Sequence, residues 1–210
     1  MSNRIALITG ATSGIGEATA RLLAKNNFDL ILCGRRTDRL EKLAKELPAK
    51  VQTLSFDVSD RKSVSKALHG LKVDVLINNA GNAHGLDPIQ SGNVDDWDAM
   101  MDINVKGLLY VSREVLPGMV ERKSGHVINI GSIAGKEVYP GGNVYSASKF
   151  AVDAITRSMR IDLNAAGIKV TGIHPGLVET EFALVRFKGD EGKASNVYKG
   201  MKPLVGGDIA

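Results

Sequence analysis

Six short apolar runs, rich in Val, Ile and Leu, recur along the chain, and the segments between them carry apolar residues at helical spacing. The runs cover residues 4–9, 28–33, 51–56, 73–78, 126–130 and 169–174. Strands that alternate with helices form parallel sheets, because the chain must cross a face of the sheet between neighbouring strands. The pattern predicts an α/β fold, a doubly wound parallel sheet in a three-layer α/β/α arrangement, as a single domain over residues 1–210.

A glycine-rich turn, GATSGIG, connects the first run to the first helical segment. Gly10, Gly14 and Gly16 permit a tight turn and a close approach of the backbone to a phosphate, and the helix N-terminus adds unpaired N–H groups. The spacing G-x-x-x-G-x-G differs from the common dinucleotide fingerprint, and it lacks the lysine of a triphosphate-binding loop. The turn predicts a phosphate-binding site, with a plain glycine-rich loop as the alternative.

The second run ends in Gly34-Arg35-Arg36, where a nucleotide-binding fold that prefers NAD has an acidic residue for the ribose 2′-hydroxyl. This chain has two arginines instead, and a guanidinium matches the geometry of a phosphate. The pair indicates NADP as the cofactor. In the alternative interpretation, both arginines are solvated charges at a helix start that pair with Asp38 or Glu41.

Polar residues follow the third and fourth runs. Asp57 either faces the adenine edge of a dinucleotide or caps the helix that begins near Asp60. The sequence Asn78-Asn79-Ala80-Gly81 lets the backbone approach a flat ligand, or else forms a plain turn.

Two long helices are predicted in the second half of the chain. One spans residues 93–123 with Asn93 as its cap, and the other spans 144–166 and is closed by Gly167. Asn104 interrupts the apolar series of the first helix, as a satisfied core residue or as a functional hydrogen-bonding group.

The strongest candidate for catalysis is the pair Tyr145 and Lys149, which share one face of a helix because they are four residues apart. A nearby ammonium favours the phenolate and brings a tyrosine towards acid/base work at neutral pH. Ser132 follows the fifth run, at the carboxyl edge of the sheet, where it could bond the carbonyl oxygen that Tyr145 protonates. The alternative is an ordinary helix start at the surface.

The composition narrows the possible partners to a small-molecule substrate. The 27 Lys and Arg residues are scattered among 23 Asp and Glu, which argues against nucleic acid. Neither a signal peptide nor an 18-residue apolar span is present, so we expect no membrane partner and a cytoplasmic location. Cys33 is the single cysteine and excludes an internal disulfide, and the four histidines lack metal-ligand spacing, so no metal is expected.

Taken together and in this order, the motifs resemble the short-chain dehydrogenase/reductase family, from residue 4 to about residue 180. The resemblance implies a Rossmann fold and the interconversion of an alcohol and a carbonyl with a nicotinamide cofactor. It rests on Thr9-Gly10-x-x-x-Gly14-x-Gly16, Asn78-Asn79-Ala80-Gly81, Asn104, Ser132, Tyr145-x-x-x-Lys149 and Pro175-Gly176.

The resemblance also implies roles for individual residues. Tyr145 would exchange a proton with the substrate oxygen, Lys149 would lower the pKa of Tyr145 and hold the nicotinamide ribose, and Ser132 would orient the carbonyl. Asn104 would support a water relay to Lys149. The cofactor-binding residues would be Gly10, Ser13, Gly14, Ile15, Gly16, Arg35, Arg36, Asp57, Val58, Asn79, Ala80, Gly81, Tyr145, Lys149, Pro175, Gly176, Val178 and Thr180.

The segment after Pro175 resembles a branch of the family that acts on serine-like and short 3-hydroxy acids. Such a substrate would contact Ser132 and Tyr145, and a cation on a lid over residues 180–203 would bind its carboxylate. We expect Arg186 in this role, with Lys188 as the other possibility and solvated loop charges as the alternative. His84 is a weaker candidate for contact with the substrate.

Members of the family usually continue for some tens of residues past Ala210, so the carboxyl-terminal segment is expected to be shortened. We expect a homo-oligomer, a dimer or tetramer, with helices near 105–122 and 144–165 as a possible dimer contact. Two other functions remain open. The first is a general carbonyl or 3-oxoacyl reductase, and the second is a catalytically silent NADP-binding sensor or scaffold, against which the intact catalytic set argues.

Overall fold

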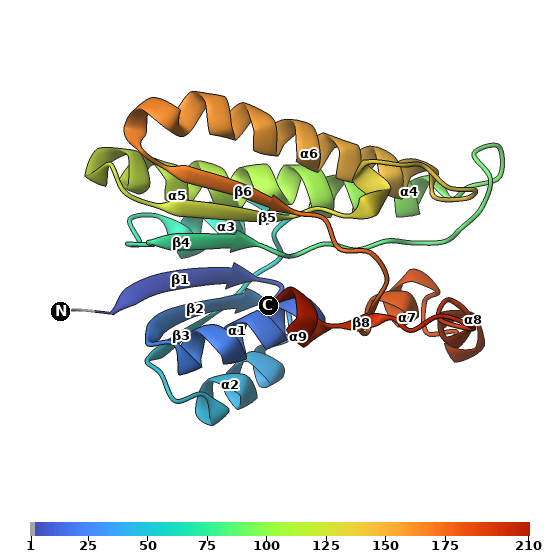
Figure 1. Ribbon diagram of the computed structural model, residues 1–210, viewed down its shortest axis with the longest axis horizontal. Coiled ribbons are helices and arrows are strands. Elements are labelled where there is room, and N and C mark those ends of the chain that lie inside the picture. The colour runs from blue at the N-terminus through green and yellow to red at the C-terminus, as the bar shows by residue number, and fades with distance from the viewer. Residues whose placement is uncertain (1–2) are drawn as a thin grey trace.

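A six-stranded parallel sheet forms the centre of the protein in the computed structural model, which describes residues 3–210. The strand order is β3-β2-β1-β4-β5-β6, so the order reverses between β1 and β4 (Figure 1). Each predicted apolar run forms one strand, which confirms the predicted doubly wound sheet. The strands are β1 (Arg4–Thr9), β2 (Phe28–Gly34), β3 (Val51–Ser55), β4 (Val75–Asn78), β5 (His126–Ile130) and β6 (Lys169–Ile173).

Helices cover both faces of the sheet, because alternate residues of each strand point to opposite faces and both sets are apolar. Ile8 and Leu32 belong to one core with α1 and α2, whereas Leu7 and Cys33 belong to the other core with α3, α5 and α6 (Figure 1). These helices are α1 (Gly14–Lys25), α2 (Thr37–Glu46), α3 (Arg61–Leu68), α5 (Leu108–Arg122) and α6 (Asn143–Leu163).

Side-chain hydrogen bonds cap the amino ends of α3 and α4 (Val94–Met101). The Asn93 side chain accepts a hydrogen bond from the Asp96 N–H and so caps α4. Asp60 accepts one from the Lys62 N–H and caps α3. Gly167, at a φ of +72°, ends the short 3-10 turn (Asn164–Ala166) that follows α6, as its position after the helical pattern predicts.

The long helix predicted over residues 93–123 is not one regular helix. A π-helical turn, η1 (Asp102–Gly107), separates α4 from α5. Such turns insert an extra residue into the helical repeat and are frequent at functional sites. Asn104 lies in this turn and is buried.

After β6 the chain leaves the six-stranded sheet and later forms a separate two-stranded sheet. Two short helices, α7 (Phe182–Arg186) and α8 (Glu191–Asn196), lie beyond the carboxyl ends of the strands (Figure 1). The chain then pairs β8 (Leu204–Val205) in parallel with β7 (Val178–Glu179), and α9 (Gly206–Ile209) packs against α1. Within residues 3–210 no helix is both long and apolar enough to cross a membrane.

Candidate active site

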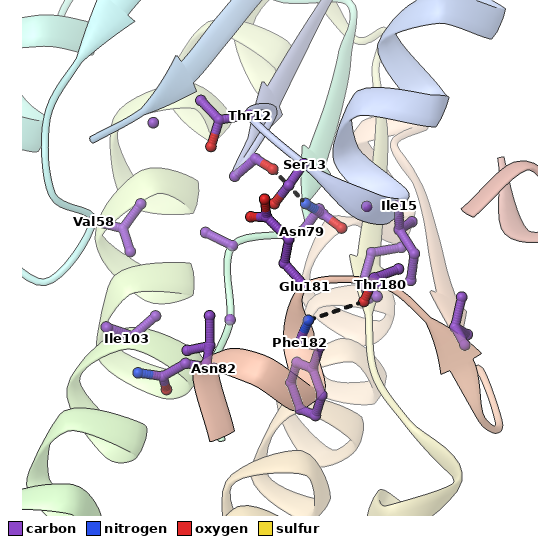
Figure 2. A pocket seen from close by; sticks show the side chains of 18 of the residues that line it. Thr12, Ser13, Ile15, Val58, Asn79, Asn82, Ile103, Thr180, Glu181 and Phe182 are labelled. Atoms are coloured by element: carbon purple, nitrogen blue, oxygen red, sulfur yellow. Dashed lines mark hydrogen bonds between the residues drawn. The ribbon is translucent and has the colours of Figure 1, made fainter. Parts of the chain in front are cut away.

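A cleft of about 340 Å³ opens at the carboxyl ends of the strands, where the strand order reverses. Open α/β sheets place their ligands at this point. Side chains from the glycine turn, from the segment after β4 and from the segment after β7 face the same space (Figure 2). The predicted residues that line it are Gly10, Ser13, Gly14, Ile15, Arg35, Arg36, Asp57, Val58, Asn79, Ala80, Gly81, Ser132, Tyr145, Lys149, Pro175, Gly176, Val178 and Thr180.

Five predicted residues, Gly16, Asn104, Arg186, Lys188 and His84, do not line the cleft directly. Gly16 lies behind the glycine turn, Asn104 lies beneath the segment after β4, and Arg186 lies beside Tyr145 at the edge of the cleft. The cleft also contains residues that the sequence did not single out. They are Thr12, Gly34, Phe56, Asn82, Ile103, Ile130, Gly131, Glu181, Phe182 and Val185.

The glycine turn needs its glycines for two reasons. Gly10 and Gly14 have φ angles of +65° and +54°, a region that disfavours side chains. At Gly16 a Cβ atom would collide with the Gly10 carbonyl oxygen and would lie 2.5 Å from the Asn79 Nδ2. The turn can therefore bring its backbone N–H groups close to a bound phosphate.

We expect Gly16→Ala to destabilise the fold by about 2 kcal/mol, in the range of substitutions that overpack a tight site. The Cβ would push the turn away from Asn79, so cofactor affinity should fall as well. Gly207→Ala is the control, since a Cβ there meets nothing within 4 Å. Urea unfolding of both variants would test this, and equal stability of the two would contradict the packing argument.

Asn79 ties the end of β4 to the end of β1. Its Nδ2 donates to the Thr9 carbonyl at 2.9 Å and to the Gly10 carbonyl at 3.2 Å. The Thr9 hydroxyl in turn accepts from the N–H groups of Asn79 and Ala80, both at 3.0 Å. These bonds hold the two strands that border the cleft at a fixed separation.

The two arginines that follow β2 bind partners other than Asp38 and Glu41. Arg36 contacts the hydroxyl of Thr12 at 2.8 Å, the hydroxyl of Ser13 at 3.0 Å and the carboxylate of Glu181 at 2.8 Å. Arg35 lies 3.4 Å from the carboxylate of Asp57 and is more exposed.

Asp57 forms a local turn with Ser59. Its Oδ1 accepts from the Ser59 N–H at 2.9 Å and from the Ser59 hydroxyl at 2.7 Å, whereas Asp60 caps the helix. Burial acts to raise the pKa of Asp57, but the Ser59 hydrogen bonds and the Arg35 charge outweigh it and leave the pKa below its ordinary value. Asp57 is therefore an ionised acceptor at the edge of the cleft.

Ser132, Tyr145 and Lys149 meet at the inner end of the cleft, as their sequence positions predict. Ser132 follows β5, and its hydroxyl accepts from the Ala134 N–H at 3.1 Å. Tyr145 and Lys149 lie on one face of α6, with the Lys149 ammonium 5.9 Å from the centre of the Tyr145 ring. Lys149 also donates to the Ile130 carbonyl at 3.0 Å.

Burial is the largest cause of the pKa shifts of Tyr145 and Lys149. It raises the pKa of Tyr145, although the hydrogen bond with Ser132 and the charge of Arg186 lower it in part. It also lowers the pKa of Lys149 from 10.5 to about 8. The expected lowering of the Tyr145 pKa by Lys149 is thus not seen, because desolvation opposes the charged form of both groups.

Asn104 uses its amide to hold the segment after β4. The oxygen accepts from the Asn82 N–H at 2.8 Å, and the nitrogen donates to the Asn82 carbonyl and to the Ser148 hydroxyl, both at 2.9 Å. These contacts agree with a satisfied core asparagine. The Asn104 oxygen and the Lys149 ammonium lie on the same side of Gly81, as a water relay between them would require. The relay itself stays a prediction.

Arg186 of α7 lies over the ring of Tyr145. Its guanidinium carbon is 5.5 Å from the centre of the Tyr145 ring, and an Nη atom donates to the Tyr139 hydroxyl at 2.8 Å. The Arg186 Nε donates to the Gly85 carbonyl at 2.9 Å. Lys188, the other candidate, forms an ion pair with Asp96 at 2.9 Å instead.

Two further side chains complete this side of the site. The Phe182 ring packs against the Tyr145 ring, with 5.6 Å between their centres. His84 contacts the Asn82 side chain through Nε2 at 2.9 Å and does not line the cleft, so its expected contact with a substrate stays a prediction.

Comparisons with known proteins show the family to which the chain belongs. The family model described as short chain dehydrogenase matches residues 4–190, and the chain belongs to this family of oxidoreductases. The NADP-dependent 3-hydroxy acid dehydrogenase of Salmonella typhi is 47% identical over 98% of this chain and 85% of its own length.

Other relatives carry serine in their names. The serine 3-dehydrogenase of Rhizobium radiobacter is 44% identical over 97% of this chain and 84% of its own length. A solved structure of the closed form of serine dehydrogenase complexed with NADP+ superposes with a TM-score of 0.93 at 45% identity, over 98% of this chain and 85% of that one. The resemblance predicted from the motifs is confirmed.

Proposed function

We propose that this protein is an NADP-dependent oxidoreductase that interconverts an alcohol and a carbonyl on a short 3-hydroxy acid or serine-like substrate. The single observation that carries the proposal is the position of Arg186, which places a cation 5.5 Å from the ring centre of Tyr145. If the substrate carboxylate binds Arg186, a hydroxyl two or three bonds from that carboxylate would lie near the phenol of Tyr145. The names of the relatives support the same cofactor and substrate class.

The residues of the cleft fit NADP. Gly16 leaves room that a Cβ would fill beside the Gly10 carbonyl, as a pyrophosphate-binding turn requires. Arg36 stands at the end of β2 with its guanidinium directed across the cleft, where it would bind the 2′-phosphate. Asp57 and Val58 would border the adenosine half, and Val178 and Thr180 would border the nicotinamide half. NADP, when bound, supplies or accepts the hydride.

Tyr145 is the proton donor and acceptor in this proposal. Its raised pKa keeps the phenol protonated at neutral pH, ready to donate to a carbonyl oxygen during reduction. Ser132, which lies close enough to Tyr145 to lower the pKa of its phenol in part, would hold the same oxygen. Lys149, with its pKa near 8, would receive or return a proton beside Tyr145 and hold the nicotinamide ribose.

The carboxylate contact is tested by Arg186→Ala. We expect KM for L-serine and short 3-hydroxy acids to rise by roughly 10-fold or more, since a charge-assisted bond is worth about 1.5–3 kcal/mol. The kinetic constants for a neutral ketone should change little. Lys188→Ala is the matched control, because Lys188 pairs with Asp96. Equal losses on acids and neutral ketones would contradict the assignment.

The segment from residue 180 to residue 203, which contains α7 and α8, is proposed as the lid. It adjoins the cleft through Glu181 and Phe182, and two bonds between Gly85 and Arg186 join it to the loop after β4. An ordered segment of this kind would exclude water from the reacting atoms.

A homo-oligomer, a dimer or a tetramer, is also proposed. Apolar side chains on α5 and α6 are exposed, among them Leu109, Val120, Phe150 and Ile161. Such a face would be covered in a dimer. The location we propose is the cytoplasm, where a chain whose lone thiol, Cys33, is buried needs no oxidising environment to fold.

A further inference from the structure

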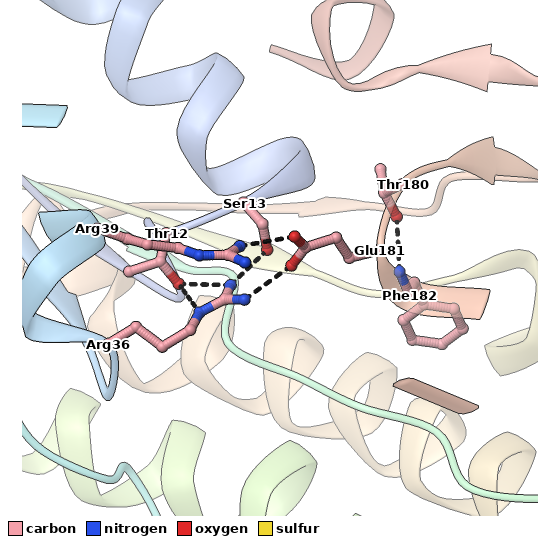
Figure 3. A network of polar contacts seen from close by, with 7 residues as sticks. All are labelled: Thr12, Ser13, Arg36, Arg39, Thr180, Glu181 and Phe182. Carbon is pink, nitrogen blue, oxygen red and sulfur yellow. Dashed lines mark hydrogen bonds and ion pairs between the residues drawn. The ribbon is translucent and has the colours of Figure 1, made fainter. Parts of the chain in front are cut away.

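Glu181 joins two parts of the cleft that come from distant parts of the sequence. It follows Thr180 directly and precedes α7, and each of its two carboxylate oxygens contacts one of two guanidinium groups (Figure 3). The contact to Arg36 is 2.8 Å and the contact to Arg39 is 2.6 Å. The carboxylate thus lies on the cationic group where the proposed cofactor would present its 2′-phosphate.

The two arginines are held as a pair. Arg36 is oriented by the hydroxyls of Thr12 and Ser13 in the glycine turn, so its direction is tied to the phosphate-binding turn. Arg39 lies in the first turn of α2, three residues further on, and therefore shares one side of that helix with Arg36. Two forks that meet on one carboxylate form an anion-binding site.

We propose that Glu181 competes with the 2′-phosphate of NADP for Arg36 and Arg39, so that it limits the affinity for the cofactor and releases the start of α7 when the phosphate displaces it. The inference rests on the proposed cofactor and adds to it one binding residue, Arg39, and one competitor, Glu181.

Charge favours the exchange. The two guanidiniums carry two positive charges and Glu181 supplies one negative charge, whereas a phosphate monoester supplies nearly two at neutral pH. Burial acts to raise the pKa of Glu181, but the hydrogen bonds of Arg36 and Arg39 outweigh it and leave the pKa below its ordinary value. Glu181 is therefore ionised, and able to compete, throughout the neutral range.

The same residue connects the phosphate site to the substrate side. Phe182, the next residue, donates its N–H to the Thr180 hydroxyl at 3.2 Å and packs its ring on Tyr145. Arg186 lies one helical turn further along. Because α7 begins at Phe182, release of Glu181 would free the amino end of the segment that carries the proposed carboxylate partner.

The test uses 2′-AMP, which carries the phosphate in question, and 5′-AMP, which has the same charge at another position. We expect Glu181→Gln to bind 2′-AMP and NADPH roughly 10-fold more tightly than the original chain, as the loss of one competing charged bond predicts. Binding of 5′-AMP should not change. Arg39→Ala should bind 2′-AMP roughly 10-fold more weakly and 5′-AMP equally well. Isothermal titration calorimetry measures each constant.

Glu46→Gln is the matched control. Glu46 also pairs with an arginine, Arg21 at 2.7 Å, and its side chain is 39% exposed, as is that of Glu181. This variant should leave both affinities unchanged. Hydrogen exchange at residues 182–186 should be faster in Glu181→Gln than in the original chain, and 2′-AMP should accelerate it only in the original chain.

Unchanged or weaker binding of 2′-AMP by Glu181→Gln would overturn the competition, and so would an equal gain for 5′-AMP. Failure of every variant to bind 2′-AMP would overturn it as well. Exchange at residues 182–186 that ignores 2′-AMP would overturn the release of α7. Because all readouts are binding or exchange, a chain that shows the predicted binding but oxidises no hydroxy acid would refute the proposed substrate alone.

Discussion

Tyr145→Phe is expected to lower kcat by about 1000-fold, within the range that general acid catalysis supplies. The substitution removes only the hydroxyl, so the ring can keep its contacts with Phe182 and Arg186. Cofactor affinity and stability should therefore stay close to their original values. Steady-state oxidation of NADPH with a carbonyl substrate measures the loss, and titration with NADPH measures the affinity.

Tyr110→Phe is the control for this substitution, since Tyr110 lies on α5 among the core contacts and away from the cleft. It should retain full activity. Activity of Tyr145→Phe within a few-fold of the original would contradict the assigned role, because Tyr145 is the one tyrosine among the described residues that line the cleft.

Lys149→Met is expected to stabilise the fold at pH 7 while it reduces activity. The pKa of Lys149 is about 8 in the fold against 10.5 ordinarily, so keeping it protonated below pH 8 costs about 3 kcal/mol. The methionine variant also loses the hydrogen bond to the Ile130 carbonyl, which lowers its stability by about 1 kcal/mol. The net gain at pH 7 should be about 2 kcal/mol.

The stability of the original protein depends on pH through Lys149. Between pH 8 and pH 10.5 the unfolded chain holds more protons on Lys149 than the folded chain, so the original protein gains stability as pH rises through this window. The methionine variant lacks that gain, and its advantage should shrink between pH 7 and pH 9.5. Urea unfolding at both values measures the difference.

Lys66→Met is the control, since Lys66 is exposed on α3 and its replacement should change neither value much. A Lys149→Met variant that is less stable than the original at pH 7 would show that the buried ammonium contributes more through its contacts than it costs by desolvation.

Much of the fold follows from local pattern. Each strand of the six-stranded sheet is a short apolar run, and Asn93 caps α4 where its position predicts. Asp60 caps α3 in place of the expected Asp57. The ends of β1 and β4 meet because parallel strands place their carboxyl ends at one edge of a sheet. Asn79 and the glycine turn therefore adjoin as the sequence predicts, and so do Ser132, Tyr145 and Lys149.

Other features depend on contacts between distant residues and leave no local signal. Glu181 pairs with Arg36 across 145 positions, and nothing near either residue indicates it. The burial of Tyr145 and Lys149 reverses the expected direction of the phenol pKa, since spacing reports distance but not desolvation. Thr12 could have been found, because it lies inside the glycine turn beside Ser13.

The sequence pattern also did not predict the pairing of β8 with β7 or the packing of α9 on α1. The strands β7 and β8 are two residues long, and such short runs carry no periodicity. The approach of Gly206 to Gly14 and Ala18 depends on small residues on both sides, which only the packed structure reveals.

The proposed activity is tested most directly by the reduction of NADP+ and of NAD+ by the purified chain with L-serine, 3-hydroxyisobutyrate and a neutral secondary alcohol. We expect NADPH to form with a hydroxy acid and the neutral alcohol to react poorly. When NAD+ replaces NADP+, kcat/KM should fall by roughly 10- to 100-fold. A preference for NAD+, or turnover of the neutral alcohol with no turnover of either hydroxy acid, would contradict the proposed activity.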